Sequence, residues 1–185
     1  AADLPEDERQ LIEARYRAMA HDWDRAIALY SGLRARHPDD GEHALRLTKA
    51  LLDGGRFKEA LRTCQETKES VPGAAGDAVL GITEAEVYQK LDDHARAVEA
   101  AEGARAIAER NGARGLVARS YSLAGWAHHN LGEPAAARRE LETAESLFRA
   151  LGDLEGVALA HRSIAVLLRR AGHAQQAQRG CVVFT

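Results

Sequence analysis

Neighbouring histidines and paired carboxylates are the residues of this chain with the most direct chemistry. His128 and His129 are adjacent, which would make them candidate metal ligands. Successive residues of a helix point about 100° apart, so two such imidazoles cannot easily bind one ion. We therefore interpret them as surface or groove histidines. Two pairs of carboxylates are interpreted as solvated side chains or helix-start charges, namely Glu84 with Glu86 and Asp92 with Asp93.

Motifs for phosphate binding and for nucleophilic catalysis are absent from the sequence. Neither GxxxxGK nor GxSxG occurs. The two cysteines, Cys64 and Cys181, lie far apart, and neither has a second thiol or a histidine at metal-ligand spacing. Cys64 occupies a predicted core position, which favours a buried thiol, and no disulfide framework is implied. The sequence thus predicts a protein that is not an enzyme and that has no metal and no cofactor.

The charge balance predicts neither nucleic acid nor an anionic membrane as a direct partner. The formal net charge of the 185 residues is −3. No apolar run approaches membrane-spanning length, and the first ten residues lack the charged and apolar order of a signal peptide. We therefore expect a cytoplasmic protein. The charge is uneven, because no acidic residue follows Glu155 whereas four arginines do: Arg162, Arg169, Arg170 and Arg179.

A long-range repeat is the strongest pattern in the chain. Five alanines in similar neighbourhoods recur at spacings of 34, 37, 40 and 40 residues: Ala26, Ala60, Ala97, Ala137 and Ala177. Helical periodicity repeats every few residues, so this recurrence indicates a copied supersecondary unit. Apolar residues at helical spacing, abundant Ala and Leu, and few β-branched residues predict that each unit is a pair of helices.

The repeat divides the whole chain, 1–185, into a single array of about five units. The predicted units cover residues 7–40, 41–77, 78–117, 118–157 and 158–185, the last of them incomplete. Small residues stand at one offset in the first helix of four units, where they would let two helices approach closely: Ala14, Ala85, Gly125 and Ala165. In the fifth unit we expect a turn at Gly172-His173 before Ala177.

This pattern resembles the tetratricopeptide repeat (TPR) family. The resemblance rests on the small first-helix residue, the Gly-containing turns, the recurring alanine and the prolines that close the first two units, Pro38 and Pro72. It implies an all-α, right-handed superhelical solenoid of about five antiparallel helix pairs. The longer later units look similar to the extended repeats of bacterial multidomain regulators. The Lys and Asn residues of the family's clamp for chaperone tails are missing, so that a chaperone-tail adaptor is not expected.

The resemblance also implies a concave groove lined by the first helices of the units. The candidate groove residues are Arg15, Lys49, Gln89, Arg119, Ser122, Trp126, His129, Asn130, Arg162 and Arg169. Trp and Arg are frequent binding anchors, and Arg suits an acidic segment. Two interpretations remain open. Trp126 either lies in the groove or packs between helices, and the arginines either bind a partner or pair with exposed glutamates.

We therefore predict a module that binds a protein or peptide segment, acidic in character. It would be the sensor or scaffold region of a bacterial cytoplasmic regulatory protein. One alternative is an accessory array that regulates a larger enzyme such as a kinase or nucleotide cyclase. Another is a self-association module that forms a homo-oligomer through the uncapped C-terminal unit.

Overall fold

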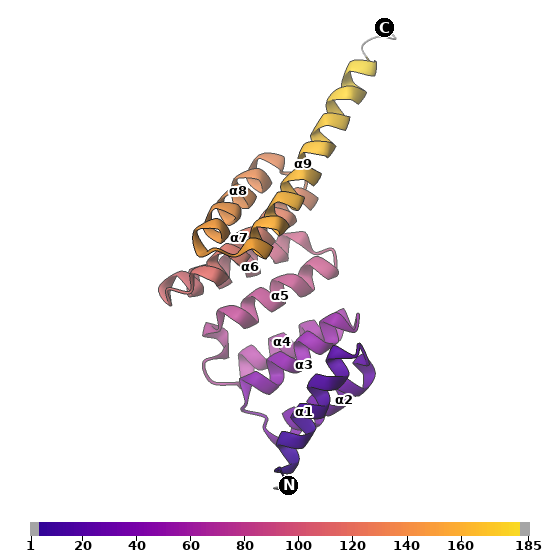
Figure 1. The fold of residues 1–185 in the computed structure, drawn as a ribbon, viewed down its shortest axis with the longest axis vertical. Helices are drawn as coiled ribbons and strands as arrows, with labels where there is room; N and C mark the ends of the chain where they lie inside the picture. Colours follow the sequence, from indigo (N-terminus) through magenta and orange to yellow (C-terminus); the bar gives the residue numbers. More distant parts are fainter. Residues whose placement is uncertain (1–3, 182–185) are drawn as a thin grey trace. The chain divides into compact units, whose positions relative to one another are not determined.

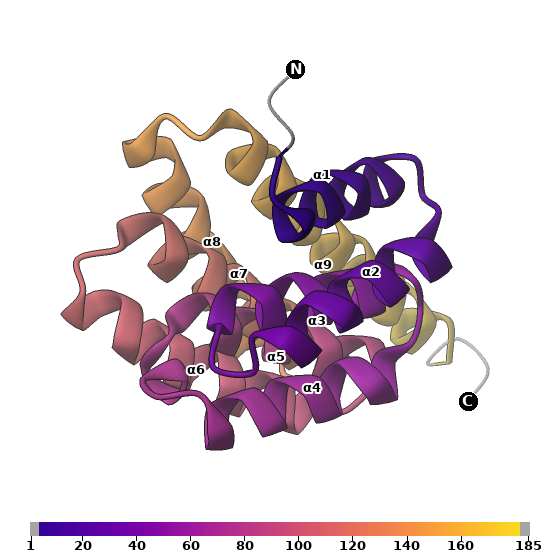
Figure 2. The ribbon, with the colours of Figure 1, turned by 90° about the horizontal axis from the view of Figure 1, so that it is seen from below.

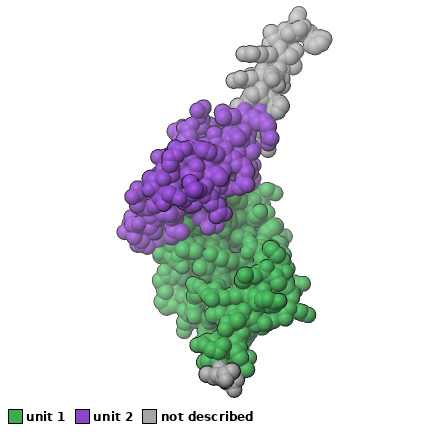
Figure 3. All heavy atoms as spheres, viewed as in Figure 1, with its two compact units in different colours: residues 1–93 green, residues 94–185 purple. Residues whose placement is uncertain are grey.

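The computed structural model describes the backbone of residues 4–181 and the side chains of residues 4–169. Every regular element in that part of the chain is helical, and consecutive helices are joined by short turns (Figure 1). The all-α prediction is confirmed. The chain divides into two compact units, residues 1–93 and 94–185 (Figure 3), and each is described by itself. That all the repeats form a single array stays a prediction.

Unit 1 contains the shorter helices. Its elements are α1 (Glu6–Met19), α2 (Trp23–Arg36), α3 (Gly41–Asp53), α4 (Phe57–Ser70), the 3-10 helix η1 (Ala74–Gly76) and α5 (Ala78–Lys90). Each helix packs against the next one along the chain, and α3 also contacts α5. Figure 2 shows α3 between α2 and α4.

Aspartates at helix N-termini explain where two of these helices begin. The Asp40 carboxylate accepts hydrogen bonds from the backbone N–H groups of Glu42 and His43 at 2.8 and 3.3 Å. The Asp77 carboxylate does the same for the first turn of α5. Such caps satisfy backbone donors that have no partner within the helix. Pro38 and Pro72, the prolines predicted to close the first two units, both lie between helices.

Unit 2 contains the longer helices, as the wider spacing of the later alanines predicts. Its elements are α6 (His94–Arg110), α7 (Arg114–Asn130), α8 (Pro134–Leu151) and α9 (Leu154–Cys181). Helices α6, α7 and α8 have 17, 17 and 18 residues, against 13 or 14 in each of α1 to α4. Helix α7 packs against α6, α8 and α9, and α8 also packs against α9.

The recurring alanines are packing positions. Ala26, Ala60, Ala97 and Ala137 are each fully buried, which confirms the prediction for the four that are described. The side chain of Ala177 lies outside the described residues. A methyl group fills each position, and a larger side chain there would force neighbouring helices apart.

Close helix approach is also confirmed at most of the small first-helix positions. Ala14 and Ala85 are fully buried. At Gly125 of α7, an added Cβ would lie 2.7 Å from Cγ of Leu141 on α8. Ala165 is the exception, because it is exposed on α9.

The predicted turn at Gly172-His173 is wrong, because α9 is one continuous helix from Leu154 to Cys181. No Ser, Thr, Asp, Asn or Pro follows His173 within this helix, so nothing marks the start of another. A single Gly destabilises a helix by only about 1 kcal/mol relative to Ala, which does not end it. Without a returning helix, the side of α9 that carries Ala165 has no partner among the described residues, and that alanine is exposed.

Candidate functional site

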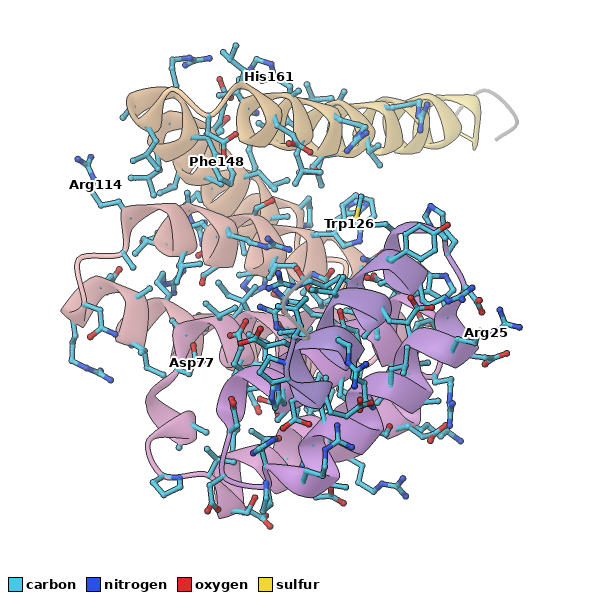
Figure 4. The ribbon with its side chains drawn as sticks, turned by 60° about the horizontal axis from the view of Figure 1, so that its bottom comes forward. Arg25, Asp77, Arg114, Trp126, Phe148 and His161 are labelled. Carbon is cyan, nitrogen blue, oxygen red and sulfur yellow. The ribbon has the colours of Figure 1, made fainter. Side chains whose placement is uncertain are left out.

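A small aromatic cluster on α7 joins three of the predicted groove residues. The rings of Trp126 and His129 lie 5.3 Å apart, centroid to centroid, at an angle of 45°. The side-chain amide of Asn130 donates a hydrogen bond of 3.0 Å to the backbone oxygen of Trp126. Trp126 and Asn130 are both half-buried. Trp126, which Figure 4 labels, thus packs against His129 in its own unit and is partly accessible.

Two predicted groove residues of α7 are poorly accessible to a partner. Ser122 and His129 are each only 7% exposed. Residues 122, 126 and 129 follow one another at helical spacing, yet only Trp126 among them is not buried. Arg119, the predicted groove residue that precedes them on this helix, is exposed.

Helix α9 carries two of the predicted groove residues, Arg162 and Arg169, and both side chains are exposed. One side of α9 packs against α7 and α8 through Ala160, Ser163 and Leu167, which are all buried. The opposite side is exposed, and we call it the α9 face; its residues are Leu154, Ala158, His161, Arg162, Ala165, Leu168 and Arg169. Helical spacing places these seven residues in one stripe.

The α9 face is both apolar and basic. Leu154 is 82% exposed and Leu168 is 55% exposed. Among the described residues, no carboxylate lies within ion-pairing distance of Arg162 or Arg169, which argues against pairing with exposed glutamates for these two. His161 does have a partner, since its Nε2 lies 2.8 Å from Glu145 of α8, and His161 and Arg149 together hold the pKa of that carboxyl below its usual range. The two arginines therefore leave positive charge uncompensated beside exposed leucines.

The remaining predicted residues lie in unit 1. Arg15 on α1 and Lys49 on α3 are exposed, and neither has a carboxylate partner among the described residues. Gln89 on α5 is half-buried. The predicted residues thus fall on separate helices of two units, and a single groove that joins all of them stays a prediction.

The histidine pair behaves as helix geometry requires. His128 Nδ1 lies 2.6 Å from Glu133 Oε2, whereas His129 contacts Trp126, so the two imidazoles diverge. In the part of the chain with described side chains, no three His, Cys, Asp or Glu residues converge as metal ligands would. Cys64 is fully buried, as predicted, and burial together with the nearby Glu84 carboxylate raises the pKa of its thiol to about 12.

Sequence reasoning missed the exposure of the two leucines of the α9 face, Leu154 and Leu168. The predicted turn at Gly172-His173 implies a second helix that would pack over Leu168, so this leucine is expected to be buried. The signal that could have revealed it is the lack of any helix-start residue after His173. None of the described helices is long and apolar enough to cross a membrane.

Comparison with known proteins identifies the repeat. Residues 17–81 match the family model described as tetratricopeptide repeat, which confirms the resemblance predicted from the sequence. A search of curated proteins finds no match.

Solved structures extend the likeness beyond the matched segment. A crystal structure of MamA protein is similar over 94% of this chain and 90% of its own, with 17% identity and a TM-score of 0.64. A Rap protein complexed with Competence and Sporulation Factor is similar over 96% of this chain, with 14% identity and a TM-score of 0.76. This chain spans about half of that Rap chain, of which 53% is covered.

A third similar structure is the TPR2B domain of yeast Sti1 in complex with pHsp70. It is 25% identical, covers 63% of this chain and 94% of its own, and has a TM-score of 0.54. Together these structures confirm the predicted fold class, an all-α solenoid of the tetratricopeptide type.

Proposed function

We propose that this chain is a protein-interaction module that binds an acidic segment of a partner. The observation that carries the proposal is the pair of uncompensated guanidinium groups on the α9 face, Arg162 and Arg169, beside Leu168. Guanidinium groups bind carboxylates through charge-assisted hydrogen bonds, and exposed leucines add apolar contact area. A partner segment that alternates acidic and apolar side chains complements this surface.

Trp126 is the proposed aromatic anchor of the same interaction. It lies on α7, which, like α9, is the first helix of its predicted unit. In a tetratricopeptide solenoid the first helices line the concave groove, so a partner in the groove would meet both helices. The further predicted contacts are Arg15, Lys49, Gln89, Arg119 and Asn130.

The structural comparisons support an interaction role. The similar Rap and Sti1 structures are complexes, with Competence and Sporulation Factor and with pHsp70 respectively. We propose that this chain is the sensor or scaffold region of a bacterial cytoplasmic regulatory protein.

Affinity capture from the native cell tests the proposal, with the chain itself as bait. We expect the variant that combines Trp126→Ala with Arg162→Glu to lose the captured partner while circular dichroism shows its helices intact. Arg138→Glu is the matched control, because Arg138 is an exposed arginine of the same unit that is already paired with Glu142 at 2.7 Å. An unchanged set of captured proteins in the double variant would reject the proposal.

A second candidate function is self-association through the α9 face. The observation that favours it is the exposure of Leu154 and Leu168, since exposed apolar residues on an uncovered helix face mark interaction surfaces. Light scattering over a range of concentrations checks it. The expected result is a mass that rises with concentration and that falls to the monomer mass in Leu168→Glu. A monomer mass at every concentration would contradict it.

A further inference from the structure

A pocket of about 490 Å³ opens in unit 1, on the opposite side of α3 from the predicted groove residue Lys49. Its apolar lining includes Ile27 of α2 and the two α3 leucines Leu47 and Leu51, and its walls come from α2 and α4. This volume lies within the range of about 300 to 1,000 Å³ that is usual for small-ligand sites. The pocket therefore has room for an apolar group of modest size.

Three arginines and two glutamates also line the pocket, and one arginine is fully paired. Arg56 donates two hydrogen bonds of 2.6 Å to Glu59, one from Nε and one from Nη2. This bidentate pair satisfies both side chains and removes them from the charge balance. The two other arginines, Arg34 and Arg62, share the remaining carboxylate of Glu66.

The shared carboxylate is too distant to satisfy either of the remaining arginines. Nη2 of Arg34 lies 3.6 Å from Glu66, and Nε of Arg62 lies 3.7 Å from its other oxygen. Both distances exceed those of a hydrogen bond. The Arg34 side chain is only 17% exposed, and its Nη1 is buried without a hydrogen-bond partner. A buried donor without an acceptor is destabilising, and more so when it is charged.

We infer that this pocket binds a ligand with one carboxylate and an apolar body. The carboxylate would accept hydrogen bonds from Arg34, and the apolar body would lie on Leu47 and Leu51. The charge balance selects this chemistry: two incompletely paired guanidinium groups face one carboxylate, which leaves a single positive charge. A dianion would exceed this single positive charge and meet repulsion from Glu66, and a cation would meet Arg34 and Arg62.

The carboxylate and apolar body could belong to the C-terminal end of a peptide or to a free aliphatic acid. Three probes distinguish these two classes of ligand. Acetyl-Leu-Leu represents the C-terminal end of a peptide, its C-terminal amide removes only the charge, and octanoate represents a free aliphatic acid. Each is titrated to about 10 mM into the ¹⁵N-labelled full chain, and amide shifts of α2 to α4 are followed. We expect at least one acid to bind, and acetyl-Leu-Leu to bind about ten-fold more tightly than its amide if the peptide end is the source. Binding by octanoate alone assigns the free acid.

Two variants assign the binding to the pocket. Arg34→Gln should abolish the preference for the acid, whereas Arg25→Gln, an exposed arginine on the same helix, should retain it. Ser31→Trp fills the pocket from an exposed lining position and should abolish binding of every probe without affecting the core. Equal affinity for acid and amide without octanoate binding, no shifts at these helices, or binding retained in Ser31→Trp would each overturn the inference.

Discussion

At the scale of single residues, small side chains determine how closely the helices of this protein pack. The recurring alanines are fully buried, and Gly125 allows α7 to lie directly against Leu141 of α8. These positions could be predicted from the sequence because a packing site tolerates few side chains at a constant offset. The exposure of individual residues could not be predicted in this way: Ser122 and Trp126 share one face of a helix, yet Ser122 is buried and Trp126 is only half-buried.

Gly125→Ala tests this close approach. The added methyl group would lie 2.7 Å from Leu141, so the helices must shift, and we expect the free energy of unfolding to fall by about 1 to 3 kcal/mol. Urea denaturation followed by circular dichroism measures it. Gly103→Ala is the control, since no atom lies within 4 Å of its added Cβ, and it should raise stability by about 0.5 to 1 kcal/mol. Equal effects of the two substitutions would show that Gly125 has no packing role.

At the scale of elements, polar side chains tie helix ends together. Asp7 in the first turn of α1 accepts a hydrogen bond of 2.8 Å from Nε of Arg36, and its other oxygen lies 2.7 Å from Nε2 of His37. This carboxylate thus joins the start of α1 to the end of α2. The hydrogen bonds with His37 and Arg36 hold the pKa of Asp7 below its ordinary value.

Removal of this carboxylate should have a pH-dependent effect. Because the pKa of Asp7 is lower in the folded state, its contribution is present above the unfolded-state pKa and disappears as the pH falls through the folded-state value. Asp7→Asn should therefore reduce the urea midpoint more at pH 7 than at about pH 2, and the reduction should shrink steadily as the pH falls below the unfolded-state pKa. A difference of equal size at both pH values would instead indicate lost hydrogen bonds without a charge contribution. Asp39→Asn, an exposed aspartate without a described bond, serves as the control.

Helix α9 shows where element prediction from the sequence fails. The periodicity before Gly172 correctly predicts a helix, but the expected end relied on a glycine and on analogy with the earlier units. Earlier turns carry further signals, such as Pro134 at the start of α8 and Gly152 with a φ of 72° at the end of that helix. The sequence after His173 has no such signal, so the helix continues.

At the scale of the whole molecule, the sequence specifies the scaffold far better than its target. Five alanines predict the repeat, and within the two units α1 packs against α2, α3 against α4, and α7 against α8, as helix pairs do. The proposed function rests instead on uncompensated charge and on exposure, which are properties of the folded surface. Arg162 and Arg169 became the strongest candidates only when the structure placed them away from every carboxylate among the described residues.

The most direct test of the proposed function is the affinity of the captured partner for the purified chain, measured by titration calorimetry. We predict that Arg162→Glu with Arg169→Glu raises the dissociation constant at least about ten-fold, because charge reversal opposes an acidic segment. Arg138→Glu should leave it within about two-fold, since that arginine is already paired. Equal affinity of the wild type and the double variant would contradict binding at the α9 face.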